Sequence, residues 1–241
     1  MAFYSSISIA YDQLFPLNPA QAEFVNSCFA NSVAGKKIVD AGCGIGSLAI
    51  LLARRSANVY GFDSDSNMID IAKEKQPQAL NLKFNVGDLV DELSGLERNR
   101  YHGVLCFGNT LVHLATIDRI EQFVKQSSRL LKRDGKLLIQ IVNYDRVLKK
   151  KVDSLPTINT DNYEFIRKYN HRSDGLIDFE TVLSAKFTCE QTVNSVLLLP
   201  LKREELEDAL TPYFTKVNFY GDFKKSPLSE DSFHIVVEAS K

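Results

Sequence analysis

Three alternating glycines mark the stretch of the sequence that is best suited to hold a ligand. Gly42, Gly44 and Gly46 follow the apolar run at 37–39 and come directly before a helix-forming run at 47–55. Glycine permits positive φ values and a close approach of the backbone to a ligand. The first turn of a helix also presents free N–H groups with partial positive charge. The sequence therefore predicts a turn here that binds a carboxylate or a phosphate.

The spacing of these glycines distinguishes between two ligands. A dinucleotide site needs Gly-x-Gly-x-x-Gly, whose third glycine would stand where this chain has Ser47. The observed pattern is Gly-x-Gly-x-Gly, preceded by Asp40. Residues 39–46, Val-Asp-Ala-Gly-Cys-Gly-Ile-Gly, resemble motif I of the class I S-adenosylmethionine-dependent methyltransferases. The resemblance implies S-adenosylmethionine as cofactor, and a hydride-transfer enzyme that uses NAD is the alternative that the spacing disfavours.

Acidic residues follow the next two predicted strands. Asp63 ends the second strand, where a carboxylate can accept hydrogen bonds from both hydroxyls of a ribose or cap the following helix. Asp88 follows the third strand. In the methyltransferases that this chain resembles, an acidic residue at this place bonds the adenine amino group and its apolar neighbour packs on the ring. The resemblance implies an adenine pocket formed by Asp88, Leu89 and Met68, while a turn aspartate and a core methionine are the alternatives.

Two further motifs are similar to those of the glycine and sarcosine N-methyltransferases. Residues 108–114, Gly-Asn-Thr-Leu-Val-His-Leu, are similar to their Gly-Asn-Ser-x-x-His-Leu stretch, and residues 143–145 repeat their Asn-Tyr-Asp. Because ligands of such sheets lie at the carboxyl ends of the strands, we expect Asn109 and His113 to face the methyl-transfer site. The resemblance also implies that two tyrosines near the N-terminus close over the cofactor, namely Tyr4 and Tyr11.

One position departs from that subfamily. Its glycine-methylating members carry an arginine directly before Asn-Tyr-Asp that clamps the substrate carboxylate, and Val142 stands there in this chain. Valine cannot form the bidentate ion pair. Either the acceptor lacks a carboxylate, or another arginine supplies the clamp, with Arg146, Arg167 and Arg172 as candidates. For Asn143 and Tyr144, a role as anchors of the following segment is the alternative to a role in binding.

The predicted site therefore consists of two groups of residues. The candidates for orienting or activating the acceptor are Asn109, His113 and Tyr11. The candidates for binding the cofactor are Asp40, Gly42, Cys43, Gly44, Gly46, Asp63, Ser64, Met68, Asp88, Leu89, Phe107 and Tyr11. No metal is predicted, because residues 108–109 offer none of the acidic ligands that metal-dependent O-methyltransferases carry at this end of the sheet.

The nature of the acceptor decides whether the site needs a base. A sulfonium cofactor already makes its methyl group electrophilic, so an amine has only to arrive neutral. A hydroxyl acceptor needs a base, and His113 is the best candidate because its unperturbed pKa is near neutrality. The resemblance to the glycine and sarcosine N-methyltransferases implies methyl transfer to a small-molecule amine. An O-methyltransferase of a small metabolite and a catalytically silent S-adenosylmethionine-binding protein are the alternatives.

The elements that must position these residues alternate between strand and helix from residue 36 onward. This alternation predicts an α/β fold with a doubly wound, mostly parallel seven-stranded sheet, similar to the Rossmann arrangement. Strands are expected at 37–42, 58–62, 82–86, 101–107, 136–142, 216–220 and 233–238. Helices are expected at 18–32, 46–55, 65–75, 117–132 and 202–211.

A change of period separates a further segment from this sheet. After Asn143, apolar and polar residues alternate, which predicts an antiparallel β insertion of three strands between about 150 and 200. The expected division of the chain is a cap segment at 1–35, a cofactor-binding core at 36–145, the insertion over the active site at 146–200, and a closing helix and two strands at 201–241.

Composition limits the possible partners. The 241 residues are 44% hydrophobic and 24% charged, and the net charge of -1 disfavours a nucleic-acid partner. The four cysteines fit neither a zinc site nor a disulfide framework. No apolar run has the length of a membrane span and no signal peptide is recognisable. We expect a cytoplasmic protein that acts on a small molecule, without a membrane partner; a homo-oligomer is compatible with the sequence.

Overall fold

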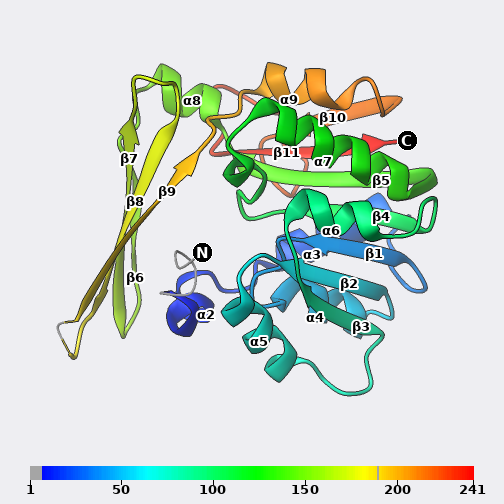
Figure 1. The fold of residues 1–241 in the computed structure, drawn as a ribbon, viewed down its shortest axis with the longest axis horizontal. Helices are drawn as coiled ribbons and strands as arrows, with labels where there is room; N and C mark the ends of the chain where they lie inside the picture. The colour runs from blue at the N-terminus through cyan, green and yellow to red at the C-terminus, as the bar shows by residue number, and fades with distance from the viewer. Residues whose placement is uncertain (1–6, 189) are drawn as a thin grey trace.

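The computed structural model describes residues 7–188 and 190–241 of the chain. A seven-stranded sheet forms its centre, in the order β10-β11-β5-β4-β1-β2-β3 (Figure 1). Neighbouring strands are parallel, except that β11 is antiparallel to both β5 and β10. The predicted mostly parallel sheet is therefore confirmed. Its strands are β1 (Lys37–Ala41), β2 (Asn58–Asp63), β3 (Leu82–Val86), β4 (Tyr101–Cys106), β5 (Leu131–Val142), β10 (Lys216–Tyr220) and β11 (His234–Ser240).

Helices cover both faces of the sheet, as the alternating pattern predicts. Apolar side chains of α3, α4 and α5 pack on one face, and those of α6, α7 and α9 pack on the other. Successive strand residues contribute to the two layers in turn, so that Ile38 joins the first cluster and Val39 the second. The helices are α3 (Pro19–Cys28), α4 (Ser47–Arg54), α5 (Ser66–Lys75), α6 (Leu89–Gly95), α7 (Ile117–Leu130) and α9 (Arg203–Leu210).

The central strand β5 is longer than its apolar run predicts. It starts at Leu131 instead of residue 136 and continues through Asp134, whose φ is 62°, and Gly135. Tyr101 pairs with Leu131, and the register between β4 and β5 then shifts before Gly103 pairs with Lys136. Asp134 and Gly135 therefore lie inside β5, where they accompany the shift in its pairing with β4. The adjoining helix α7 consequently ends at Leu130.

The glycine turn has the backbone conformation that its sequence predicts. Gly42, Gly44 and Gly46 have φ values of 75°, 53° and 77°, a region that side-chain-bearing residues rarely adopt. Gly46 is the N-cap of α4. A Cβ atom on Gly46 would lie 2.4 Å from the ring of Phe84, and one on Gly42 would lie 2.3 Å from the Thr110 methyl group. Both conformation and packing therefore require glycine at these two positions.

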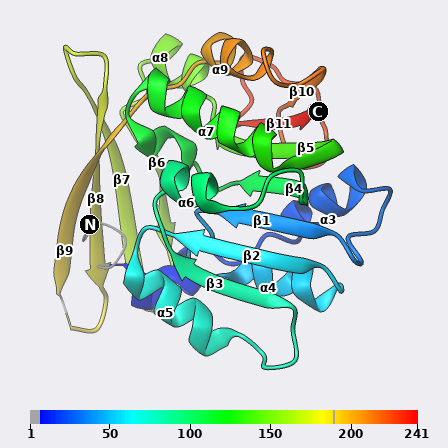
Figure 2. The ribbon, with the colours of Figure 1, turned by 45° about the vertical axis from the view of Figure 1, so that its right-hand side comes forward.

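The predicted antiparallel insertion contains one strand more than expected. It is a four-stranded sheet in the order β6-β7-β8-β9 and stands beside the carboxyl ends of β1, β2 and β4 (Figure 2). The additional strand β6 carries Pro156 and no alternating pattern, and a proline is tolerated at the sheet edge where β6 lies. The strands are β6 (Ser154–Asn159), β7 (Tyr163–His171), β8 (Ile177–Ala185) and β9 (Gln191–Leu198).

Several short elements were not predicted from the sequence. The helix α6 is capped by Asp88, whose carboxylate accepts hydrogen bonds from the N–H groups of Val90 and Asp91. Asn143 caps α8 (Tyr144–Lys149) in the same way. A 3-10 turn, η2 (Leu111–Leu114), carries His113. Such elements are too short to show helical periodicity, and their capping residues are the only signal in the sequence.

The N-terminal segment joins the two sheets. Its first described elements are η1 (Ser8–Ala10) and α2 (Tyr11–Leu14), and the following helix α3 ends at Cys28 instead of residue 32. Ile7, Ala10 and Leu14 pack with Phe165 and Leu183 of the insertion. An ion pair of 2.7 Å between Asp12 and Lys75 holds α2 near α5. The segment therefore lies between the insertion and the helices of the main sheet, as Figure 1 shows.

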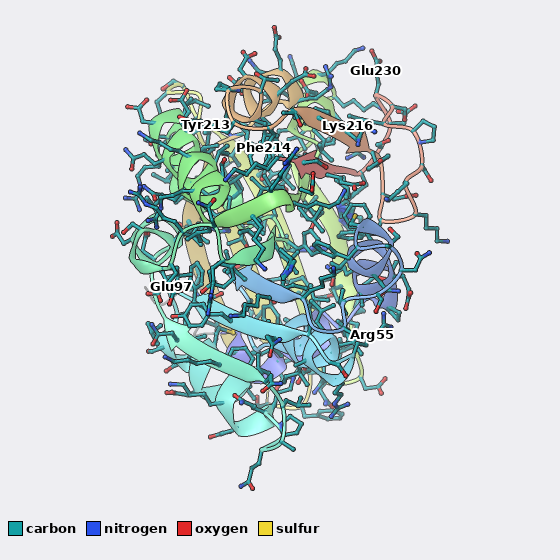
Figure 3. All side chains as sticks on the ribbon, turned by 90° about the vertical axis from the view of Figure 1, so that its right-hand side faces the viewer. Arg55, Glu97, Tyr213, Phe214, Lys216 and Glu230 are labelled. Atoms are coloured by element: carbon teal, nitrogen blue, oxygen red, sulfur yellow. The ribbon has the colours of Figure 1, made fainter. Side chains whose placement is uncertain are left out.

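At the end of the main sheet that lies away from the insertion, the surface is formed by the loops that connect helices to the following strands. Figure 3 views this end, with Arg55 after α4, Glu97 before β4 and Lys216 at the start of β10. Glu97 and Lys216 are exposed there. The carboxyl ends of the parallel strands point away from this surface, toward the insertion. Ligand chemistry is therefore expected on the insertion side alone.

Replacing Gly46 tests the conformation of the turn. We expect Gly46→Ala to lower the free energy of unfolding by about 3 kcal/mol, from roughly 1–2 kcal/mol of backbone strain and 1–3 kcal/mol of overpacking against Phe84. Urea unfolding followed by circular dichroism measures this loss. The matched control is Gly95→Ala at the end of α6, where nothing lies within 4 Å of the added carbon and no loss is expected. Equal stability of the two variants would contradict the described turn.

Candidate active site

Asp63 holds the glycine turn in place. Its Oδ2 atom accepts a hydrogen bond of 2.9 Å from the Gly44 N–H, and its Oδ1 atom accepts one of 3.0 Å from the Asp65 N–H. Asp65, and not Asp63, caps α5. The backbone N–H of Ser64 also bonds to this carboxylate, which has about four lone-pair positions, so acceptor capacity for a ligand hydroxyl remains. Burial raises the pKa of Asp63, and its backbone hydrogen bonds oppose this rise.

Asp40 is a buried acid directly beside this turn. Its side chain is 3% exposed and forms no ion pair with a described basic residue. Desolvation, assisted by the negative charge of Asp63, raises the pKa of Asp40 to about 7. A positively charged ligand group would stabilise its ionised form. The end of β1 is therefore prepared for a cationic group.

A cavity of about 460 Å³ connects the glycine turn with the insertion. Its walls come from the N-terminal segment, the turn after β1, the segment after β4, the end of β5 and the inner face of the insertion. The predicted site residues that line it are Tyr11, Asp40, Gly42, Cys43, Phe107, Asn109 and His113, together with Val142. The structure thus brings together the turn, the segment after β4 and the N-terminal tyrosine, as the sequence predicts.

Tyr11 lies over the glycine turn. A Cβ atom built on Gly44 would be 3.6 Å from the Tyr11 hydroxyl oxygen. Burial, together with the charge of Asp63, raises the pKa of this phenol, so Tyr11 stays protonated at neutral pH. Its hydroxyl can therefore donate a hydrogen bond beside the turn. The second predicted tyrosine, Tyr4, lies outside the described residues.

Asn109 connects the segment after β4 to the end of β5. Its Oδ1 atom accepts a hydrogen bond of 2.9 Å from the Val142 N–H, and its Nδ2 atom donates one of 2.9 Å to the Tyr144 hydroxyl. The residue has a φ of 65°, which asparagine tolerates better than most residues. Asn109 therefore holds the cavity wall in shape, and its side-chain oxygen is already engaged in the absence of a ligand.

His113 reaches the cavity from η2. Burial lowers the pKa of its imidazole to about 4. The side chain is therefore neutral at pH 7, and proton transfer to it from a hydroxyl acceptor is unfavourable. A neutral imidazole can still accept or donate a hydrogen bond.

A pair of polar residues that the sequence analysis assigned no function also lines the cavity. The Gly108 N–H donates a hydrogen bond of 2.8 Å to the side-chain oxygen of Gln140, and the amide nitrogen of Gln140 lies 3.1 Å from His234 Nδ1. Because an amide nitrogen only donates, Nδ1 is the acceptor and the proton of a neutral His234 is on Nε2. Burial lowers the pKa of His234, which favours the neutral ring. The sequence alone does not indicate this pair, because Gln140 and His234 are brought together by the antiparallel pairing of β11 with β5.

The residues predicted to bind adenine, Asp88, Leu89 and Met68, do not line this cavity, and neither do four other predicted cofactor residues, Gly44, Gly46, Asp63 and Ser64. Asp88 caps α6, and its Oδ1 atom also accepts a hydrogen bond of 2.7 Å from Arg119 Nη2. Met68 is 1% exposed within α5, Leu89 is buried and Ser64 is exposed. An adenine contact with Asp88 therefore has to share this carboxylate with Arg119, and it remains a prediction.

Residues 7–188 and 190–241 contain no cluster of three or more His, Cys, Asp or Glu side chains that could hold a metal ion. Within the same ranges, no helix combines the length and the apolar character that crossing a bilayer requires.

The sequence of this chain is similar to those of known methyltransferases. Residues 38–135 match the family described as a methyltransferase domain. The ubiquinone biosynthesis O-methyltransferase of Coxiella burnetii is 29% identical over 128 residues, which is 53% of this chain and 51% of the relative. The glycine/sarcosine N-methyltransferase of Aphanothece halophytica is 24% identical over 204 residues, which is 84% of this chain and 75% of the relative. The chain thus spans about half the length of the first of these relatives.

Solved structures share the whole fold. An S-adenosylmethionine-dependent methyltransferase from Clostridium acetobutylicum has a TM-score of 0.80 at 17% identity, with 98% of each chain covered. An amino pentose methyltransferase from Micromonospora echinaspora, with S-adenosylmethionine bound, has a TM-score of 0.74 at 15% identity and covers 98% of this chain and 97% of its own. At these identities the similarity establishes the fold.

The raised pKa of Asp40 predicts a pH-dependent stability. At pH values between 3.8, the usual pKa of an aspartate, and about 7, Asp40 keeps its proton in the folded chain and has lost it in the unfolded chain. The stability of the protein therefore falls as the pH rises through this range, by on the order of 4 kcal/mol in total. We expect Asp40→Asn to be more stable than the parent at pH 8 and equally stable near pH 4, in urea unfolding without ligand.

An exposed aspartate on α5 provides the control for this experiment. Asp70→Asn should leave the stability unchanged at both pH values. A parent protein whose stability rises between pH 5 and pH 8, unaffected by Asp40→Asn, would contradict the described environment of Asp40.

Proposed function

We propose that this chain is a class I S-adenosylmethionine-dependent methyltransferase and that it methylates a small-molecule amine. The match of residues 38–135 to the methyltransferase-domain family and the fold shared with solved methyltransferases support this proposal. S-adenosylmethionine is the cofactor of this class, and its sulfonium supplies an electrophilic methyl group. The observation that carries the proposal is the depressed pKa of His113, about 4, in a cavity that adjoins the glycine turn. Its basicity is too low for efficient deprotonation of a hydroxyl at neutral pH.

The residues around the turn fit the cofactor. Asp40 is a buried carboxylate without an ion-pair partner among the described residues, and it suits the positive charges of S-adenosylmethionine. Asp63 retains acceptor capacity for a ribose hydroxyl. The glycines leave the backbone open to close approach, and Tyr11 covers the turn. We propose that Asp88, Leu89, Met68 and Ser64 complete the adenosine site, with Cys43 and Phe107 on the cavity side.

The remaining residues orient the acceptor. Asn109 holds the segment after β4 against the end of β5, which keeps His113 at the cavity wall. A neutral His113 accepts a hydrogen bond from an amine N–H, so that the nitrogen lone pair is directed elsewhere, toward the methyl group. Such positioning contributes up to roughly 7–11 kcal/mol to lowering a reaction barrier. The apolar walls exclude water and favour the neutral amine over its ammonium form.

The same argument defines the expected partners. A net charge of -1 disfavours a nucleic-acid substrate, and a cavity of about 460 Å³ suits a small molecule. The 24% identity to a glycine/sarcosine N-methyltransferase over most of both chains agrees with nitrogen as the acceptor atom. The O-methyltransferase relatives align with about half of this chain only, so they carry less information about the insertion that completes the acceptor side.

A screen for release of S-adenosylhomocysteine tests the proposal directly. The acceptors are glycine, sarcosine, dimethylglycine, unrelated small amines and matched phenols. We expect turnover with members of the amine series and none with the phenols. Turnover with phenols alone would establish an O-methyltransferase. Cofactor binding without turnover on any member of the panel would instead favour a silent binding protein.

The pH dependence of the rate tests the role of His113. We expect His113→Gln to lower kcat/KM without changing the shape of its profile between pH 6 and pH 9, because the imidazole does not titrate in this range. The remaining pH dependence should follow the pKa of the acceptor amine. Loss of a neutral-range ionisation in the variant would identify His113 as a general base and contradict the proposal.

Cofactor affinity should depend on the ionisation of Asp40. Because a cationic ligand binds the ionised carboxylate, we expect the affinity for S-adenosylmethionine to rise about 10- to 30-fold between pH 5.5 and pH 7.5. Isothermal titration calorimetry measures this change. The Asp40→Asn variant should bind more weakly and with little pH dependence. Equal pH dependence in both proteins would exclude Asp40 as the titrating group.

A further inference from the structure

Three arginines are candidates for binding an anionic group of the acceptor, and the structure separates them. Arg172 lies at an exposed turn, where its guanidinium pairs with Asp174 at 2.7 Å. Arg146 packs over the ring of Phe233 at 5.6 Å and does not line the cavity. Arg167, on β7, does line it. Among the described residues of the cavity wall, Arg167 is the one Lys or Arg side chain, and Asp40 is the one Asp or Glu side chain.

Arg167 has an unused hydrogen-bond donor. Its Nη2 atom donates a hydrogen bond of 2.7 Å to the carbonyl oxygen of Pro156 on the neighbouring strand β6. Its Nε atom is buried and has no hydrogen-bond partner in the part of the chain that the structure describes. No described acidic side chain forms an ion pair with it. A guanidinium does not release its proton under ordinary conditions, so a buried and unpaired donor on it is costly unless a ligand completes its contacts.

Tyr169 provides a second donor on the same face of β7. Residues 167 and 169 are two positions apart on the strand and therefore point to the same side, and both line the cavity. Asn109 donates a hydrogen bond to the Tyr144 hydroxyl, and Tyr144 and Tyr169 share another hydrogen bond. The hydrogen bond with Tyr144 lowers the pKa of the Tyr169 phenol, as a bond donated to the Tyr169 oxygen does, so Tyr144 is the donor of this pair.

The hydroxyl proton of Tyr169 is then left for a ligand in the cavity. Burial raises the pKa of this phenol to about 12, so the proton is present at neutral pH. Arg167 and Tyr169 therefore present neighbouring donors at the cavity wall, on one strand of the insertion.

The surroundings of this donor pair are apolar. Phe165 and Leu155 adjoin Arg167, and Phe179 packs against Tyr169. All three line the cavity, as does Phe233. Aromatic walls stabilise an apolar ligand body by removing its surface from water. A single guanidinium neutralises one negative charge, whereas a phosphate monoester would bring between 1.5 and 2 charges at pH 7. The site therefore suits a carboxylate better than a phosphate.

We propose that Arg167 and Tyr169 bind the carboxylate of the acceptor, which is an amino acid with an apolar side chain larger than that of glycine. This inference rests on the proposed amine methylation and adds the substrate class to it. The role of the arginine that would stand at Val142 is thereby taken by Arg167, on a strand of the insertion. The specificity for the acceptor then lies in the insertion, and the cofactor is bound by the core.

Matched pairs of amino acids and their amides provide the test. The panel contains glycine, leucine and phenylalanine in their unmethylated and N-methylated forms, each as carboxylate and as carboxamide, and 2-phenylethyl amines with and without a phosphate ester. We expect the highest kcat/KM with an apolar carboxylate. Replacement of that carboxylate by the carboxamide should lower kcat/KM about 10- to 100-fold, mainly through KM, as expected for loss of a charge-assisted contact.

Variants then assign the preference to a residue. Arg167→Gln should remove the carboxylate-to-carboxamide preference, and Arg167→Lys should restore part of it, while the affinity for S-adenosylhomocysteine stays unchanged in both. Arg172→Gln, on the same insertion but exposed, is the matched control and should keep the preference of the parent. An affinity for S-adenosylhomocysteine equal to that of the parent shows that the variants are folded.

The outcomes distinguish this inference from the proposed function. Equal turnover of carboxylates and carboxamides by the parent, or a preference that survives in Arg167→Gln, overturns the carboxylate site while amine methylation stands. A preference for the phosphate ester likewise overturns it. Cofactor binding without turnover of any amine overturns both proposals.

Discussion

The hydrogen bond between the Asp63 carboxylate and the Gly44 N–H is the interaction on which the site depends. It joins the end of β2 to the turn after β1 at 2.9 Å, and the same carboxylate also holds the N–H of Asp65 before α5. The turn can adopt this path because its three glycines all have positive φ. Thr110 then packs where a side chain on Gly42 would stand, which fixes the segment after β4 against the turn. The cofactor side and the acceptor side of the cavity are thereby held in one arrangement.

Charge in the cavity is sparse and comes from two parts of the fold. Asp40 lies beside the turn, and Arg167 lies on the insertion, while the other lining residues include aromatic side chains and two histidines whose pKa values burial lowers. Each of these charged side chains is desolvated without an ion-pair partner among the described residues. This arrangement lowers the stability of the ligand-free chain and leaves each charge available to a ligand group of opposite sign. It fits a ternary complex in which a cationic cofactor lies beside Asp40 and an anionic acceptor lies beside Arg167.

Sequence reasoning was most successful where the signal is local. Parallel strands bring their carboxyl ends to one edge of a sheet. This rule allowed us to place the glycine turn, Asp40, Asp63 and the segment with Asn109 and His113 at that edge. Gln140 and His234 could not be placed, because their pairing depends on the register of β11 against β5. Arg167 was named only as one of three candidate arginines, because choosing among them requires knowing how the insertion faces the core. Strand β6 was not predicted, because it contains Pro156 and lacks the alternation of apolar and polar residues that is typical of a strand. The pairing of Asp88 with Arg119 joins residues far apart in the sequence, and no local pattern indicates it.

Calorimetric titration of the full chain with S-adenosylhomocysteine and, separately, with NAD tests the central claim most directly. The claim is that the turn at Gly42, Gly44 and Gly46, held by Asp63, binds the methyltransferase cofactor. We predict one S-adenosylhomocysteine bound per chain, an affinity reduced at least about tenfold in Asp63→Asn, and no measurable binding of NAD. Binding of NAD without binding of S-adenosylhomocysteine would contradict the account.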